Sequence, residues 1–267
     1  MPVIEYRLAW WRRWLARPFI RAAFRLLFHI LSPVRIVGRK NVPRGEPYIV
    51  AINHVSLYEA PFIAAFWPEQ LEVMGAVDVW SRPGQNILAR LWGGIPVHRG
   101  EYDRALFDKV LAALAAGYPL LIAPEGERSH KPGMRPAKPG IAYLAEQSGL
   151  VVIPAAIIGT TDDFWQKASK GKRPQLEIRI GIPVHLPPVQ GKGEARRESR
   201  QHNANLVMRT IAGMLPEEYR GVYAVDAILP DSDSDNGDPG SSTGATTGAL
   251  TWSTCQFRPA IAVSSGA

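Results

Sequence analysis

The sequence predicts an α/β fold, a layered αβα domain around a mostly parallel or mixed sheet. Short apolar segments bounded by Gly, Pro, Asn or Asp alternate along the chain with longer segments of helical character. Strands that alternate with helices are typical of layered α/β domains. The chain has 267 residues, 46% of them apolar, which is enough for a sizeable core.

The predicted strands are short runs rich in Val, Ile, Leu and Ala. They cover 34–37, 48–52, 71–77, 94–97, 120–123, 151–158 and 175–180. The predicted helices carry residues that favour helix termini, such as Pro61 in a first turn and Gly117 after a last one. They cover 59–67, 85–92, 102–116, 141–147 and 194–214.

Composition divides the chain into three regions: an amphipathic helical arm at 1–33, the α/β domain at 34–228, and a disordered tail at 229–267. The tail is predicted because 231–251 consists almost entirely of Asp, Ser, Gly, Thr and Ala, too polar to bury a core. The longest part of the arm without Lys or Arg is far shorter than the ~20 residues that span a bilayer. Arginines also interrupt every apolar run that could serve as a cleaved signal peptide.

Positive charge is concentrated near the N-terminus. Residues 1–44 contain ten Arg or Lys and one Glu, whereas the whole chain has a net charge of only +7. Four arginines recur every four residues and form one stripe on a helix; they are Arg13, Arg17, Arg21 and Arg25.

Three tryptophans accompany this stripe, namely Trp10, Trp11 and Trp14. The combination predicts an anionic membrane surface as a partner, with guanidinium groups among phosphates and apolar rings below them. The alternative is a helix that packs its aromatic side chains on the domain and exposes its arginines. Nucleic acid is disfavoured, because it would leave the tryptophans in water. A single cysteine, Cys255, indicates a reducing compartment, so we expect a peripheral protein on the cytoplasmic face of a membrane.

A histidine and a carboxylate lie five positions apart, directly after the apolar run 48–52. If a helix begins there, Glu59 can hold one ring nitrogen of His54 while the other nitrogen faces a substrate. A histidine held in this way can accept a proton from a hydroxyl near neutral pH, because its ordinary pKa is about 6.5. Asn53 and Ser56 can hold the turn or touch the substrate.

A second segment, Gly93–Gly100, places Arg99 next to a glycine after a short predicted strand. A guanidinium there suits a phosphate, because its planar fork makes paired hydrogen bonds. The same segment contains His98, which has the five-residue spacing to Asp103 and forms the alternative catalytic pair.

A third segment, Ala123–Ser129, leaves the predicted strand 120–123 at its carboxyl end, where open α/β sheets usually hold ligands. In this segment Glu125 can accept a hydrogen bond from a substrate hydroxyl. Gly126 lets the backbone come close to a ligand, and Arg128 is a second donor for a phosphate.

These three segments and Val152–Ala155 resemble, in their order, the four sequence blocks of the glycerophospholipid acyltransferase family, and most nearly its bacterial 1-acylglycerol-3-phosphate acyltransferases. The resemblance runs from about Arg39 to Ile158 and includes the separation of 71 residues between His54 and Glu125.

The resemblance implies transfer of a fatty acyl group from acyl-CoA or acyl carrier protein to the free hydroxyl of 1-acylglycerol-3-phosphate, which gives phosphatidic acid. It implies that His54 is the base and Glu59 its partner. The phosphorylated acceptor would be held by a further set, Asn53, Ser56, Arg99, Glu125, Gly126 and Arg128. We also expect one strand end to rim the pocket, through Ala76, Val77, Asp78 and Val79. The thioester is a co-substrate; we expect no cofactor, and no metal because no third ligand lies nearby in sequence.

Two residues depart from the family pattern. Glu59 stands where the first block normally ends in aspartate, and Glu127, in the predicted acceptor pocket, stands where threonine is usual. The charge of Glu127 would repel a phosphomonoester unless the side chain points away, so another lysolipid, such as an aminolipid, is an alternative acceptor. A catalytically inactive lipid-binding homologue is a second alternative. A hydrolase is disfavoured because no nucleophile elbow is present.

Overall fold

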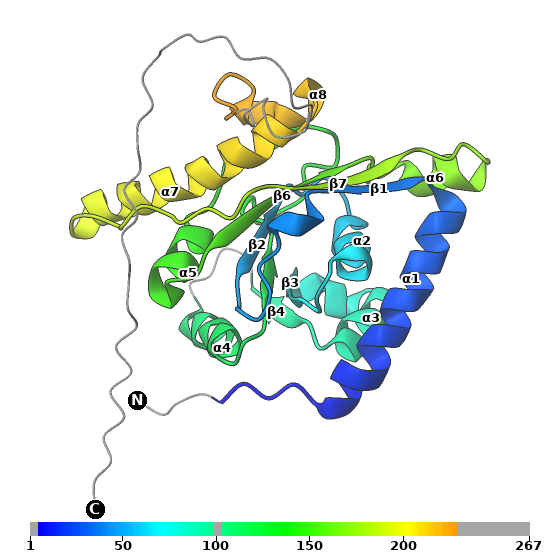
Figure 1. Ribbon diagram of the computed structural model, residues 1–267, viewed down its shortest axis with the longest axis horizontal. Helices are drawn as coiled ribbons and strands as arrows, with labels where there is room; N and C mark the ends of the chain where they lie inside the picture. Colours follow the sequence, from blue (N-terminus) through cyan, green and yellow to red (C-terminus); the bar gives the residue numbers. More distant parts are fainter. Residues whose placement is uncertain (1–4, 99–102, 229–267) are drawn as a thin grey trace, which may run out of the picture. The chain divides into compact units, whose positions relative to one another are not determined.

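The computed structural model describes residues 5–98 and 103–228, and strand β2 (Ile49–Ile52) lies at the centre of this part. Ile49 and Ala51 belong to one hydrophobic core, and Val50 and Ile52 belong to the other, because successive side chains of a strand point to opposite faces. A strand buried on both faces is typical of a sheet covered by helices on both sides. Figure 1 shows this arrangement and confirms the predicted layered αβα fold.

Within the described ranges, seven strands form one sheet in the order β1-β7-β6-β2-β5-β3-β4. Neighbouring strands are parallel except for the antiparallel pair β6 and β7, so the sheet is mixed, as predicted. Besides β2, the strands are β1 (Val34–Val37), β3 (Glu72–Ala76), β4 (Ile95–Val97), β5 (Leu120–Ile122), β6 (Val152–Ile158) and β7 (Leu176–Ile180). Because β6, β2 and β5 are parallel neighbours, their carboxyl ends meet at one edge of the sheet.

Two groups of helices cover the sheet, as Figure 1 shows. One face carries α4 (Arg104–Ala115), α5 (Gly140–Ser148) and α7 (Gly193–Met214). The other carries α1 (Arg17–Leu31), α2 (Glu59–Phe66) and α3 (Gln85–Trp92). The predicted strands and helices are confirmed within two residues at each end. The short helices α6 (Phe164–Ser169) and α8 (Glu217–Arg220) were not predicted.

The N-terminal arm differs from the prediction because its arginine side chains contact the α/β domain. A π-helical segment (Arg12–Ala16) leads into α1, and all four arginines of the stripe donate hydrogen bonds to the α/β domain. The acceptors are the Tyr118 hydroxyl for Arg13, Glu72 for Arg17, the Trp67 carbonyl for Arg21 and the Ala65 carbonyl for Arg25. The expectation that these guanidinium groups lie among phosphates is therefore wrong for Arg17, which is fully buried; for the other three arginines it stays a prediction.

The physical reason lies at the end of α2. The last carbonyls of a helix have no partner within it and carry its partial negative charge. Arg21 and Arg25 donate to carbonyls of this last turn. The alternative, in which the aromatic side chains pack on the domain, is also wrong for three of them: Trp10, Trp14 and Phe19 are 69%, 67% and 74% exposed.

Arg17 is fully buried and joins the arm to the sheet. Its guanidinium forms a paired salt bridge with Glu72, with both N–O distances at 2.8 Å, and Nε donates to the Trp92 carbonyl. The Tyr6 hydroxyl donates to Glu72 as well, at 2.7 Å. A buried ion pair is stable only when its remaining hydrogen-bonding groups are satisfied, and this network meets that condition.

No helix in the described ranges is long and apolar enough to cross a membrane. The predicted tail at 229–267, with Cys255, lies outside the described residues.

Removing one partner of the Arg17–Glu72 pair should destabilise the protein severely. Arg17→Met leaves a buried carboxylate unpaired and should lower the free energy of unfolding by about 3–5 kcal/mol, measured by urea denaturation. The double variant Arg17→Met/Glu72→Met should recover most of this loss, because no buried charge remains. Lys167→Ala, in an exposed pair with Asp163, is the control and should cause little change. Equal losses in the single and double variants would contradict this account.

Candidate active site

His54 and Glu59 form a hydrogen-bonded pair at the carboxyl end of β2. His54 lies in the loop between β2 and α2, and its Nδ1 is 2.7 Å from Oε2 of Glu59, the first residue of α2. The Glu59 side chain is fully buried, whereas that of His54 is 20% exposed. Because an ionised carboxylate can only accept, Nδ1 carries the hydrogen and Nε2 keeps a free lone pair. The pair is arranged as a base oriented by an acid.

The second oxygen of Glu59 is also fully used. Oε1 accepts from the backbone N–H groups of Val55 at 3.1 Å and Ser56 at 2.8 Å, and from the Thr160 hydroxyl at 2.9 Å. Hydrogen bonds to a buried carboxylate offset the loss of its hydration. The side chain of Glu59 therefore fixes the loop that carries His54.

Asn53 and Ser56 are buried and hold this loop in place. The Asn53 side chain donates to the Ile157 carbonyl at 2.9 Å and accepts from the Ile157 N–H at 2.8 Å, which ties the end of β2 to the end of β6. Ser56 Oγ accepts from the Tyr58 N–H at 3.0 Å. Of the two roles considered for these residues, the geometry supports holding the turn; contact with an acceptor stays a prediction.

Glu125 joins the third segment to the first. Its Oε1 accepts from the His54 N–H and its Oε2 from the Arg135 N–H, both at 2.8 Å. Two backbone hydrogen bonds reinforce this contact, from Ser129 N–H to the His54 carbonyl at 2.9 Å and from His130 N–H to the Val55 carbonyl at 3.0 Å. The sequence predicts that Glu125 accepts a hydrogen bond from a substrate hydroxyl. Both of its carboxylate oxygens, however, already accept hydrogen bonds from backbone N–H groups.

The rest of the third segment lies beside the pair. Gly126 has a φ of +74°, which favours glycine, and a Cβ there would lie 3.0 Å from Nζ of Lys138. The Glu127 carboxylate forms a salt bridge with Arg135 at 2.7 Å. Arg128 is half-buried and directly precedes Ser129, which is bonded to His54.

Other predicted residues are placed less closely. Arg99 lies outside the described residues. Ala76 ends β3, and Val77, Asp78 and Val79 follow it in a short 3₁₀ helix (Val77–Ser81). These four lie at the same edge of the sheet, two strands from β2.

The alternative pair of His98 and Asp103 is not formed. Asp103 instead caps α4 and accepts from the Leu106 N–H at 3.0 Å. The five-residue spacing is the same in both pairs, but in this one the acid stabilises a helix terminus.

Two residues near the pair were missed in the sequence. Thr160 contacts Glu59, and it follows β6 at its carboxyl end, the same position that singled out His54 and Glu125. Lys138 lies against Gly126, and its only signal was its place in a loop rich in Pro and Gly.

Burial gives Glu125 an unusual proton affinity. Its side chain is almost fully enclosed, and this loss of hydration raises its pKa to about 7, although the N–H donors of Arg135 and His54 act in the opposite direction. Among the described residues, no group of three or more His, Cys, Asp or Glu could hold a metal ion. The expectation of a metal-free reaction stays a prediction.

Comparison with solved structures identifies the class of fold. The crystal structure of the 1-acyl-sn-glycerophosphate acyltransferase PlsC from Thermotoga maritima matches with a TM-score of 0.56 and 24% identity, over 76% of this chain and 80% of that one. At this identity the match shows the fold alone.

Sequence comparison finds a similar family. The model of the acyltransferase family matches residues 33–158, which contain β2, α2 and β5 with their loops. Over this segment, just under half of its length, the chain is similar to the acyltransferase family.

Curated relatives carry related names. The human 1-acyl-sn-glycerol-3-phosphate acyltransferase alpha is 23% identical over 60% of this chain and 56% of its own length. The lyso-ornithine lipid O-acyltransferase of Pseudomonas aeruginosa is 28% identical over 74% of this chain and 77% of its own length. The alignments cover 48–65% of the first relatives that match, so the chain spans about half to two thirds of their length.

The raised pKa of Glu125 predicts a specific loss of stability with pH. Its pKa is about 7 in the folded protein against an ordinary 4.5, so the folded state binds the proton more tightly than the unfolded state. This contribution is fully present below about pH 4.5 and is lost as the pH rises to about 7. The melting temperature of the wild type should therefore fall relative to Glu125→Gln, which cannot ionise, between pH 5 and pH 8. Parallel curves for the two proteins would contradict this prediction.

Proposed function

We propose that the protein transfers a fatty acyl group from a thioester, acyl-CoA or acyl carrier protein, to the free hydroxyl of 1-acylglycerol-3-phosphate, giving phosphatidic acid for phospholipid synthesis. The observation that carries the proposal is the pair of His54 and Glu59, joined at 2.7 Å. The match of residues 33–158 to the model of the acyltransferase family supports the reaction class.

The reaction proceeds by direct attack. Nε2 of His54 takes the proton of the acceptor hydroxyl while the hydroxyl oxygen attacks the thioester carbonyl carbon. The tetrahedral intermediate then expels the thiolate, which receives the proton from the imidazolium. Glu59 keeps the ring in its productive tautomer and stabilises the imidazolium charge. A general base of this kind typically contributes 10²–10⁴-fold in rate.

The phosphate of the acceptor is bound by the cations around the third segment. Arg128 belongs to this segment, next to Ser129, which is bonded to His54, and Lys138 lies against Gly126 of the same segment. We assign Arg99 to phosphate binding as well, from the family resemblance. The salt bridge between Glu127 and Arg135 supports this assignment, because a paired carboxylate repels a phosphate less than a free one. The departure at Glu127 is thus compatible with a phosphomonoester.

A second acceptor remains a candidate because Glu127 is still 43% exposed. A carboxylate at the rim can pair with the amine of an ornithine-containing lysolipid, the acceptor class in the name of the Pseudomonas aeruginosa relative. A panel of lysophosphatidic acid, lyso-ornithine lipid and lysophosphatidylcholine, each with labelled acyl-CoA, distinguishes the acceptors. Lysolipid binding without thioester consumption would instead support the catalytically inactive homologue.

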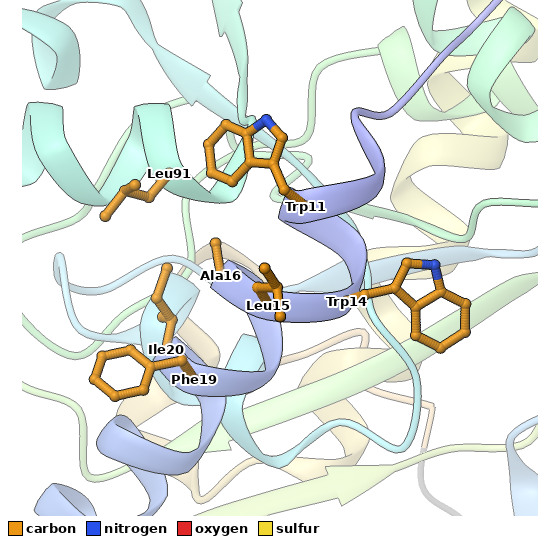
Figure 2. Close-up of a pocket in the computed structure, with 7 residues that line it drawn as sticks. All are labelled: Trp11, Trp14, Leu15, Ala16, Phe19, Ile20 and Leu91. Carbon is orange, nitrogen blue, oxygen red and sulfur yellow. The ribbon is translucent and has the colours of Figure 1, made fainter.

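We further propose that α1 and α3 dock the protein peripherally on a membrane surface. Large apolar side chains of α1 are exposed, among them Phe19, Leu26 and Ile30. An apolar hollow of about 550 Å³ lies where the π-helical segment and the start of α1 face α3. Figure 2 shows its lining side chains, with Trp11 from the arm and Leu91 from α3. An exposed apolar surface of this kind marks an interaction site. The thioester donors and the reducing compartment support the cytoplasmic face.

Loss of the base should stop thioester consumption. In an assay of free thiol released from acyl-CoA, adding 1-acylglycerol-3-phosphate should stimulate the wild type, and His54→Ala should lower the rate by at least ~10²-fold. Folding, measured by circular dichroism, should be unchanged. His98→Ala is the matched control and should keep the wild-type rate. Activity that survives in His54→Ala but is lost in His98→Ala would mean that the wrong histidine was assigned.

Charged side chains on α1 should weaken membrane binding. In co-sedimentation with phosphatidylethanolamine/phosphatidylglycerol vesicles, Phe19→Glu/Leu26→Glu should reduce binding at least ~10-fold, because two large apolar side chains can no longer enter the lipid. Val225→Glu, which changes an exposed valine elsewhere, is the control.

Binding should depend only weakly on salt, because each arginine of the stripe already donates a hydrogen bond to the protein and the side chains proposed to enter the lipid are apolar. Strong release by ~0.5 M salt would show that charge, and not apolar contact, drives docking.

A further inference from the structure

Thr160 occupies a turn that few sequences could form. It follows β6, and the preceding Gly159 has a φ of +90°, where a Cβ would lie only 2.1 Å from the Gln175 carbonyl oxygen. The Gly159 N–H donates to the Tyr219 hydroxyl at 3.2 Å. Glycine is therefore required at 159, and the turn directs Thr160 into the interior, where it is 1% exposed.

The hydroxyl of Thr160 is aimed at the acid of the catalytic pair. It donates to Glu59 Oε1 at 2.9 Å, while Oε2 of the same carboxylate faces His54 Nδ1 at 2.7 Å. The other two donors to Oε1 are backbone N–H groups of the loop that also carries His54. Among the described residues, Thr160 is thus the donor to Oε1 of Glu59 that lies outside the loop of His54, in the turn after β6.

We propose that Thr160 is a positioning residue, which allows a glutamate at position 59 to orient His54; the proposal rests on the function proposed above. Glutamate has one more rotatable bond than aspartate, and its terminal torsion is broad. A hydroxyl fixed in the turn after β6 holds the carboxylate plane so that Oε2 points at the imidazole. Asn53 keeps β2 and β6 in register through Ile157, so donor and acceptor are held by the same sheet.

Three variants test the role. Thr160→Val removes the hydroxyl at nearly constant volume and should lower kcat about 10- to 100-fold, because a hydrogen bond to a buried carboxylate is lost, with the KM for acyl-CoA within about twofold. Thr160→Ser restores the hydroxyl and should recover most of the rate. Thr161→Val is the matched control, since the neighbouring hydroxyl donates to exposed Asp163 at 2.5 Å, and it should behave as the wild type.

A double-mutant cycle separates positioning from general stability. If Thr160 acts through Glu59, Thr160→Val should add less than about twofold to the loss caused by Glu59→Gln. A full additional loss in that background would overturn the proposal, as would equal kcat losses in Thr160→Val and Thr160→Ser. All variants are compared at equal folded fraction by circular dichroism.

A second readout does not depend on catalysis. The ¹⁵N imidazole resonances of His54 report the hydrogen bond at Nδ1, and they should shift in Thr160→Val but not in Thr161→Val. Unchanged resonances in Thr160→Val would overturn the proposal. If the wild type consumes no thioester with any lysolipid, the proposed function fails, while the resonances still test whether Thr160 orients the pair.

Discussion

The site depends on one buried carboxylate, that of Glu59. A buried charge is costly unless its lone pairs are used, and here a ring nitrogen, two backbone N–H groups and a hydroxyl all donate to it. These donors come from the loop after β2 and from the turn after β6. The same interactions that stabilise the charge therefore fix the position of His54. Rigidity of the pair follows from electrostatics before any substrate is present.

A second buried carboxylate, that of Glu125, has a different task. It binds the backbone N–H groups of His54 and Arg135 and so attaches the loop after β5 to the loop after β2. The parallel order β6-β2-β5 brings all three loops to one edge of the sheet. Two acids close together would repel each other if both were ionised. Burial, together with the charge of Glu59, raises the pKa of Glu125 to about 7.

The strands, the helices and the residues flanking β2 and β5 could be predicted, because apolar runs and the residues after them are local signals. Contacts between distant segments could not. The spacing of His98 and Asp103 equals that of His54 and Glu59, yet Asp103 caps a helix. Thr160 lies 101 residues from Glu59 in sequence, and only the pairing of β2 with β6 brings them together. The short α6 lacks the length at which a helical pattern becomes visible.

The arm shows why a charge pattern alone does not define a binding surface. Its arginine stripe predicts a surface for phosphates, but protein acceptors for those guanidinium groups occur 40–105 residues further along, in the last turn of α2, at Glu72 and at Tyr118. A guanidinium that is fully buried against a carboxylate, as that of Arg17 is, cannot reach a lipid phosphate. What the helix then presents is its apolar face, with Trp14 and Phe19 exposed. Charge fixes the arm to the domain, and apolar surface is left for the membrane we propose.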